Sequence, residues 1–241
     1  MTSALLLPGM MCDGRLFAHQ RTALLAVERH AMHVIDAVPA DHDSIEAMAE
    51  AALDQTDDKQ IVPIGLSMGG IVAMECLRRA PERIASLVLM DTNPQAEIPE
   101  RRRARVTQIE RALQGDLDAV LVDEMKPLYL APSNRDDEEI LTLVLDMART
   151  LGPDIFAAQS RALAARRDYR ETLARWRGPT LLLCGEHDAL CPPERHQAMQ
   201  ALMPQAELLI VPDAGHLITL ERAMATTEAL LDFFRSLPRP L

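Results

Sequence analysis

Residues 60–80 read QIVPIGLSMGGIVAMECLRRA, which is an apolar run, a serine between two glycines and a second apolar stretch. The first run predicts a buried strand, and the second predicts a buried helix that ends before the next proline. Gly65 and Gly69 flank Ser67 in a G-x-S-x-G pattern, in which larger residues would collide within a sharp turn. The stretch therefore predicts a turn that raises the Ser67 hydroxyl above the edge of a sheet, beside a helix N-terminus that favours negative charge.

The sequence on both sides of this stretch alternates short apolar runs with amphipathic segments. The runs occupy residues 4–7, 31–35, 61–64, 87–90, 180–184 and 208–211, and helical periods occupy residues 45–53, 71–80 and 220–234. Such alternation predicts an α/β fold with a mostly parallel sheet of about six strands flanked by helices. Pro63 lies within one of these runs and has no N–H to donate to a neighbouring strand. We therefore expect either that its nitrogen faces a place that needs no donor or that the strand is locally irregular.

Residues 95–175 depart from this alternation, because they contain helical periods without a strand candidate between them. We therefore predict an α/β core made of residues 1–94 and 176–241, with an all-helical cap at residues 95–175. The cap begins with a group of arginines, Arg101, Arg102, Arg103 and Arg105. They either meet a carboxylate or phosphate of a substrate or form a solvated helix face among nearby glutamates, and we favour the solvated face.

The chain has 241 residues and a formal net charge of −11. This acidic balance argues against nucleic acid as a partner, since phosphate binding needs clustered Lys and Arg. The four cysteines show no spacing typical of a metal site, so we predict no metal or other cofactor, and we expect free thiols rather than a disulfide between Cys12 and Cys191. The sequence shows neither a signal peptide nor a membrane-spanning run, which favours a cytoplasmic monomer or homodimer without membrane partners.

A serine hydroxyl needs a base to act as a nucleophile near neutral pH. His216 is the favoured base, because it lies after a predicted strand and before the last helix, in a loop of the kind that carries catalytic groups in open α/β sheets. Asp188 also follows a predicted strand and is the favoured acid that orients the base. Glu186 and Asp91 are rival acids, because each lies at or just after the end of a predicted strand.

Acyl chemistry also needs amides that stabilise an oxyanion. The candidates are the Met68 amide at the start of the helix and the Met10 amide in the loop after the first strand. Met11 and Leu66 are predicted to contact the substrate. The chain has 13 methionines and only 3% aromatic residues, and methionine provides a deformable apolar lining. We therefore expect a small to medium aliphatic acyl group rather than a large aromatic one.

Three motifs together resemble the α/β-hydrolase superfamily, in particular its small cap-bearing esterase and lactonase branch. They are Gly65-Leu66-Ser67-Met68-Gly69-Gly70, Gly185-Glu186-His187-Asp188 and Gly215-His216. The resemblance implies the order nucleophile, acid and base along the chain, with a helical cap over the site. Family members often carry His-Gly before the oxyanion donor, where this chain has Pro8-Gly9. Dehalogenases and epoxide hydrolases of this fold have aspartate in place of Ser67, so the resemblance disfavours those reactions.

We therefore predict a serine hydrolase that cleaves a carboxylic ester through an acyl-enzyme, with Ser67, His216 and Asp188 as its triad. The same triad would serve hydrolysis of an enol-lactone or of a C–C bond, and the expected partner is a small-molecule ester or lactone. A third hypothesis is a non-catalytic protein of this fold that binds a small ligand. Substrate profiling separates the first two hypotheses, and labelling of the serine by a fluorophosphonate separates both from the third.

Overall fold

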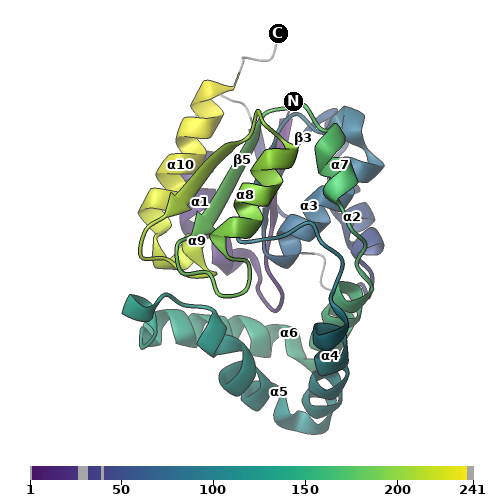
Figure 1. The fold of residues 1–241 in the computed structure, drawn as a ribbon, viewed down its shortest axis with the longest axis vertical. Coiled ribbons are helices and arrows are strands. Elements are labelled where there is room, and N and C mark those ends of the chain that lie inside the picture. Colours follow the sequence, from purple (N-terminus) through teal and green to yellow (C-terminus); the bar gives the residue numbers. More distant parts are fainter. Residues whose placement is uncertain (1, 27–31, 39–40, 238–241) are drawn as a thin grey trace.

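The computed structural model describes residues 2–26, 32–38 and 41–237, so residue 31 of the predicted run at 31–35 lies outside the described residues. Within these ranges, six strands form one parallel sheet in the order β2-β1-β3-β4-β5-β6 (Figure 1). The strands are β1 (Thr2–Leu7), β2 (Met32–Asp36), β3 (Gln60–Leu66), β4 (Leu87–Met90), β5 (Thr180–Gly185) and β6 (Glu207–Val211). The predicted α/β fold with a six-stranded parallel sheet is confirmed.

Helices cover both faces of the sheet (Figure 1). One face carries α2 (Ile45–Leu53), α3 (Met68–Arg79) and α8 (Pro193–Leu202), and the other carries α1 (Ala18–Leu25), α9 (Ile218–Glu221) and α10 (Ala223–Ser236). The short 3₁₀ turns η1 (Gly14–Phe17) and η2 (Pro81–Arg83) precede α1 and follow α3. Because both faces are covered, strands such as β4 read as continuous apolar runs. None of the helices in the described ranges has the length and apolar character needed to cross a bilayer.

The parallel strands bring distant parts of the chain to one edge of the sheet. β1 has β2 on one side and β3 on the other, so the chain changes direction across the sheet at this point. In open α/β sheets, ligands bind outside the carboxyl ends of the strands near such a point. The loops after β1, β3, β5 and β6 therefore meet where the sequence motifs require them to meet.

The pairing of β3 is irregular beside Pro63 on the β4 side, whereas its pairing with β1 continues through Pro63. Ile61 pairs with Ile84 in an isolated bridge, whereas Ile64 pairs with Val88 in the ladder between β3 and β4. Between these two pairs, β3 contributes three residue steps, from 61 to 64, and the neighbouring chain contributes four, from 84 to 88. One extra residue is accommodated opposite the proline, as in a β-bulge. A local irregularity, one of the two outcomes expected for Pro63, is therefore observed.

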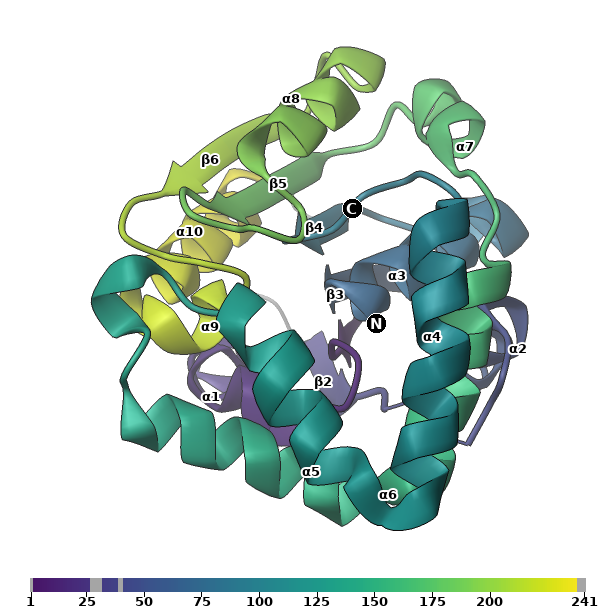
Figure 2. The same cartoon turned by 60° about the horizontal axis from the view of Figure 1, so that its bottom comes forward.

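The segment between β4 and β5 is helical. Its helices are α4 (Pro99–Arg111), α5 (Leu117–Ala119), α6 (Glu138–Ala165) and α7 (Arg170–Arg175), and its shorter turns are η3 (Ala112–Asp116), η4 (Val120–Met125), η5 (Lys126–Leu128) and η6 (Pro132–Asn134). η3 and η4 have π-helical hydrogen bonding, and α6 is interrupted by a non-helical Gly152 before Pro153. Figure 2 shows α4, α5 and α6 framing one end of the molecule, over the carboxyl edge of the strands.

The last helix of this segment, α7, packs differently from the others. It lies against α3 and α8 on the face of the sheet (Figure 1), and its Leu173 is fully buried there. We therefore propose that the cap ends with α6 and that α7 belongs to the core. This cap is shorter than the predicted one at residues 95–175.

Candidate active site

Ser67 lies on a strained turn between β3 and α3. Its backbone has φ +55° and ψ −114°, a combination that a residue with a side chain rarely adopts. A Cβ at Gly65 would lie 2.3 Å from the Gly69 carbonyl oxygen, and a Cβ at Gly69 would lie 1.8 Å from the Leu7 carbonyl oxygen. The Ser67 amide donates to the Met90 carbonyl at 2.9 Å, which ties the turn to β4. The two glycines are thus required by close backbone contacts, as the motif predicts.

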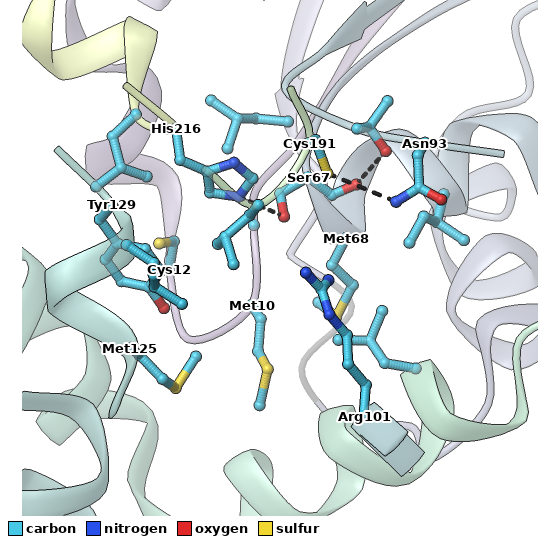
Figure 3. A pocket seen from close by; sticks show the side chains of 18 of the residues that line it. Met10, Cys12, Ser67, Met68, Asn93, Arg101, Met125, Tyr129, Cys191 and His216 are labelled. Atoms are coloured by element: carbon cyan, nitrogen blue, oxygen red, sulfur yellow. Dashed lines mark hydrogen bonds between the residues drawn. The ribbon is translucent and has the colours of Figure 1, made fainter. Parts of the chain in front are cut away.

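The three residues of the predicted triad lie within hydrogen-bonding distance of one another. His216 Nε2 is 2.8 Å from Ser67 Oγ, and His216 Nδ1 is 2.9 Å from Asp188 Oδ2 (Figure 3 shows the His216–Ser67 contact). The other Asp188 oxygen accepts the amides of Leu190 and Cys191 at 2.8 and 2.9 Å. A carboxylate can only accept, so the proton between the ring and Asp188 belongs to Nδ1, which leaves Nε2 free to accept the Ser67 hydroxyl proton.

The surroundings keep Asp188 charged although it is buried. Burial raises the pKa of Asp188, but the positive charge of His216 when its ring is protonated and the hydrogen bonds from His216, Cys191 and Leu190 lower it below its usual value overall. The His216 side chain is 4% exposed, its amide donates to the Tyr129 carbonyl at 2.7 Å, and its ring stacks on Tyr129 with centroids 6.1 Å apart. The imidazole is therefore fixed from two sides.

Neither rival acid contacts the histidine ring in the described part of the chain. Glu186 accepts the Asp213 amide at 3.2 Å and is half exposed. Asp91 is fully buried behind Asp188, with carboxylate oxygens of the two within 4.8 Å of each other, and it accepts the Gly185 amide at 2.9 Å. Burial and the nearby charge of Asp188 raise the pKa of Asp91 well above its usual value, which favours its neutral form.

The two residues predicted to donate to an oxyanion, Met10 and Met68, line the same cavity as Ser67. Met68 is the first residue of α3, where helix amides have no partner within the helix. Among the described residues, neither the Met68 nor the Met10 amide has a hydrogen-bond partner. The next amide along the loop, that of Met11, is instead bound by Gln159 Oε1 at 2.8 Å. This contrast favours Met10 over Met11 as the second donor.

A cavity of about 250 Å³ opens above the triad (Figure 3). Its lining includes Met10, Leu66 and Met68, as expected, together with Met125 from the cap. Met11 is not among the lining residues, because the backbone turns at this residue with φ +58° and its side chain packs into the core, 2% exposed. The expected contact between Met11 and substrate is therefore not supported, whereas the Leu66 position is.

The four cysteines are free thiols, as expected, and all are buried. Cys12 and Cys191 both line the cavity without forming a disulfide. Burial, followed by the charge of Asp188, raises the pKa of Cys191 to about 12, so its thiol stays protonated at neutral pH.

The arginines at the start of α4 divide into two kinds. Arg102 and Arg103 are exposed, as expected for a solvated face. Arg101 and Arg105 instead line the cavity, so the expectation was wrong for these two. The cause is the helical period, which turns residues four apart toward the same face.

Tyr129 and Glu221 are parts of the site that the sequence analysis missed. Glu221 Oε2 accepts the Ala131 amide at 2.7 Å and the Asn134 side chain at 2.9 Å, while Oε1 accepts the Gly215 amide at 2.8 Å. One buried carboxylate thus ties the cap to the loop that carries His216. These partners are separated by up to 90 residues, and no local motif marks them.

Three groups of described side chains place potential metal ligands within 4.8 Å of one another. Two of them include Asp188, whose oxygens already accept hydrogen bonds from His216 and two amides. The third, Glu186, His187 and Asp213, is exposed. These features give no support for a resident metal, and its predicted absence stays a prediction.

Comparison with known proteins agrees with this geometry. Residues 38–223 match the alpha/beta hydrolase fold family. A pimeloyl-[acyl-carrier protein] methyl ester esterase from Xanthomonas oryzae is 26% identical over 234 residues, covering 93% of this chain and 88% of that protein. A thermophilic esterase from Thermogutta terrifontis, solved with malate bound, has 31% identity and a TM-score of 0.87, with 98% of this chain and 90% of that chain covered.

A further relative is longer than this chain. The dihydrolipoyllysine-residue acetyltransferase component of the acetoin cleaving system of Pseudomonas putida is 29% identical over 230 residues, which covers 91% of this chain but only 58% of that protein. The family match spans most of the chain, and the motifs that suggested it occupy the site. The chain therefore belongs to the alpha/beta hydrolase family, and the predicted class, a hydrolase of this family, is confirmed.

Proposed function

We propose that this protein hydrolyses carboxylic esters with a small to medium acyl group through an acyl-enzyme on Ser67. One observation carries the proposal. Ser67 Oγ, His216 and Asp188 form an unbroken hydrogen-bonded chain, with contacts of 2.8 and 2.9 Å, at the floor of a cavity. Such a chain converts an unreactive hydroxyl into a nucleophile.

In the first half of the reaction, His216 Nε2 takes the Ser67 proton while Oγ bonds to the ester carbonyl carbon. The carbonyl oxygen becomes an oxyanion, which the unpaired Met10 and Met68 amides stabilise. Asp188 stabilises the imidazolium that forms. The intermediate then collapses, the bond to the alkoxy oxygen breaks, and His216 gives its proton to the leaving alcohol.

In the second half, a water molecule takes the place of the alcohol. His216 removes a proton from this water as its oxygen attacks the acyl carbon, and the same amides stabilise the second oxyanion. Collapse breaks the bond to Ser67 Oγ, which regains its proton from His216. The products are a carboxylic acid and the free enzyme.

The cavity supports a small, aliphatic acyl group. Its volume of about 250 Å³ is below the range of typical drug-sized pockets. Met10, Met68, Met125 and Leu163 line it, and Tyr129 is the sole Phe, Tyr or Trp among the described lining residues. Methionine side chains adapt to flexible chains. The esterase names of the relatives agree with an ester as substrate.

The test is hydrolysis of p-nitrophenyl esters with acyl chains from acetate to decanoate, together with γ-butyrolactone as a cyclic ester. We expect turnover of the short and medium esters, with kcat/KM falling at the longest chains, and a fall of about 10⁴-fold or more in Ser67→Ala. Faster turnover of the lactone than of all esters would favour the lactonase hypothesis. Activity that survives in Ser67→Ala would refute the proposal.

A further inference from the structure

The cavity is lined by more positive than negative charge. Arg101, Arg105 and Arg166 all contribute to its wall. Arg105 Nε lies 2.9 Å from Glu97 Oε2, and both Arg166 terminal nitrogens lie 3.2 Å from the oxygens of the same Glu97. The Glu97 side chain is 1% exposed. One buried carboxylate therefore neutralises two guanidinium groups only in part.

The other acidic side chain on the wall does not balance this charge. Glu124 accepts a hydrogen bond from Gln108 and forms an ion pair with Arg111. Arg111 does not line the cavity. Its charge is thus matched outside the cavity. The chain as a whole carries a net charge of −11, so the excess of positive charge here runs against the rest of the molecule.

Arg101 differs from the other two arginines. It lies one helical turn before Arg105 on α4, and its side chain reaches into the cavity (Figure 3). It is partly buried, yet within the described ranges its guanidinium has no ion pair and no hydrogen bond, unlike Arg105 and Arg166. A partly desolvated charge without a partner is unfavourable unless a ligand supplies one.

Arg101 lines the same cavity as Ser67, His216 and the buried Cys191 thiol. Cys191 lies beside the triad, because its amide donates to Asp188. An anion bound by Arg101 would therefore share the cavity with a carbonyl placed over Ser67.

We infer that the substrate of the proposed hydrolase carries a free carboxylate, which Arg101 binds while the ester carbonyl lies over Ser67. This inference rests on the proposed function. A guanidinium presents two parallel N–H groups that match the two oxygens of a carboxylate. The methionines between the two ends hold the intervening methylene groups. The preferred substrate is thus a monoester or lactone of a short dicarboxylic acid.

The first test compares two methyl esters of equal length, monomethyl glutarate and methyl pentanoate, by titration of the acid released. They differ in a terminal carboxylate against a methyl group. We expect the wild type to favour the charged ester, and Arg101→Gln to lower the ratio of the two kcat/KM values by about 10- to 100-fold, as for the loss of a charge-assisted pair. Arg102→Gln, the same change one residue along on the exposed face, should leave the ratio unaltered.

The second test measures binding without turnover, by calorimetry on Ser67→Ala. We expect monomethyl glutarate to bind more tightly than methyl pentanoate, and this preference to vanish when Arg101→Gln is added. Equal binding of the two esters, or an equal loss with Arg102→Gln, would overturn the inference. Tighter binding of methyl 4-phosphonobutyrate would also overturn it and point to a phosphate. Turnover of neutral esters alone would overturn the inference but leave the proposed function standing. Binding of the charged ester without any hydrolysis would refute the proposed function but support the anion site.

Discussion

The loops at the sheet edge and the cap face each other across the cavity, and they differ in how their polar groups are satisfied. At the sheet edge, Asp188 receives two amides and the His216 ring, and Thr92 donates to the Ser67 carbonyl at 2.7 Å. In the cap, Arg105 and Arg166 pair with Glu97, whereas Arg101 has no partner among the described residues. The difference supports the proposal that the sheet pre-organises the chemistry while the cap selects the substrate.

The two regions also differ in regularity. The strand ends that carry the triad follow ordinary parallel pairing, whereas the cap contains π-helical turns and a helix interrupted at Gly152. Glu221 joins the two, because it binds the Gly215 amide next to His216 and the Ala131 amide of the cap. Substitutions on each side and at this joint should therefore have distinct signatures.

The largest effect is expected on the sheet side, from Asp188→Asn. The amide would present an N–H group to Nδ1 and favour the wrong tautomer of His216, so we expect kcat for a short-chain ester to fall about 10⁴-fold. Steady-state kinetics of the purified variant give this directly. Asp213→Asn is the control, because Asp213 is exposed and its φ of +51° suits asparagine. A kcat of the Asp188 variant within tenfold of the wild type would contradict the assigned acid.

A smaller effect is expected at the joint, from Glu221→Ala. The substitution leaves the Ala131 and Gly215 amides unpaired in a buried setting, so we expect the free energy of unfolding to fall by about 2–4 kcal/mol. Urea denaturation followed by circular dichroism measures the change. Glu228→Ala, an exposed glutamate on α10, should cost far less. If the two variants lose the same stability, Glu221 does not join the cap to the loop.

An effect that depends on pH is expected behind the triad, from Asp91→Asn. The native pKa of Asp91 is raised above its unfolded value, so its contribution to stability is complete below the unfolded pKa and is lost as pH rises through the native pKa. Asparagine does not titrate and still accepts the Gly185 amide. We expect the free energy of unfolding of the variant, relative to the wild type, to increase from pH 4 to pH 8 in urea titrations. A difference that does not change with pH would mean that Asp91 is ionised in the native protein.

Much of the core could be predicted from the sequence because its signals are local. The β4 run at 87–90 and the α2 period at 45–53 have the bounds that their apolar patterns predict. The triad motifs each lie at the end of one strand, so parallel pairing was enough to bring them together. The sequence left two outcomes open at Pro63, since the choice depends on the register of the neighbouring strand.

The rest depends on contacts that no local pattern encodes. Met10 and Met11 have identical side chains. The backbone turn at Met11, with φ +58°, directs the first to the cavity and the second to the core. The sequence alone could not show that Arg101 lines the cavity and Arg102 does not, because this depends on the orientation of α4 over the sheet. Gln159 reaches the Met11 amide across 148 residues. Such contacts follow from how the cap docks, which propensity and periodicity do not fix.

The central claim is that Ser67 is a nucleophile activated by His216 and Asp188. Its most direct measurement is covalent labelling with a fluorophosphonate, followed by mass spectrometry of the digested protein. We expect one adduct, on the peptide that contains Ser67, with labelling absent from Ser67→Ala and strongly slowed in His216→Gln. An unlabelled wild type, or an adduct on any other residue, would contradict the account.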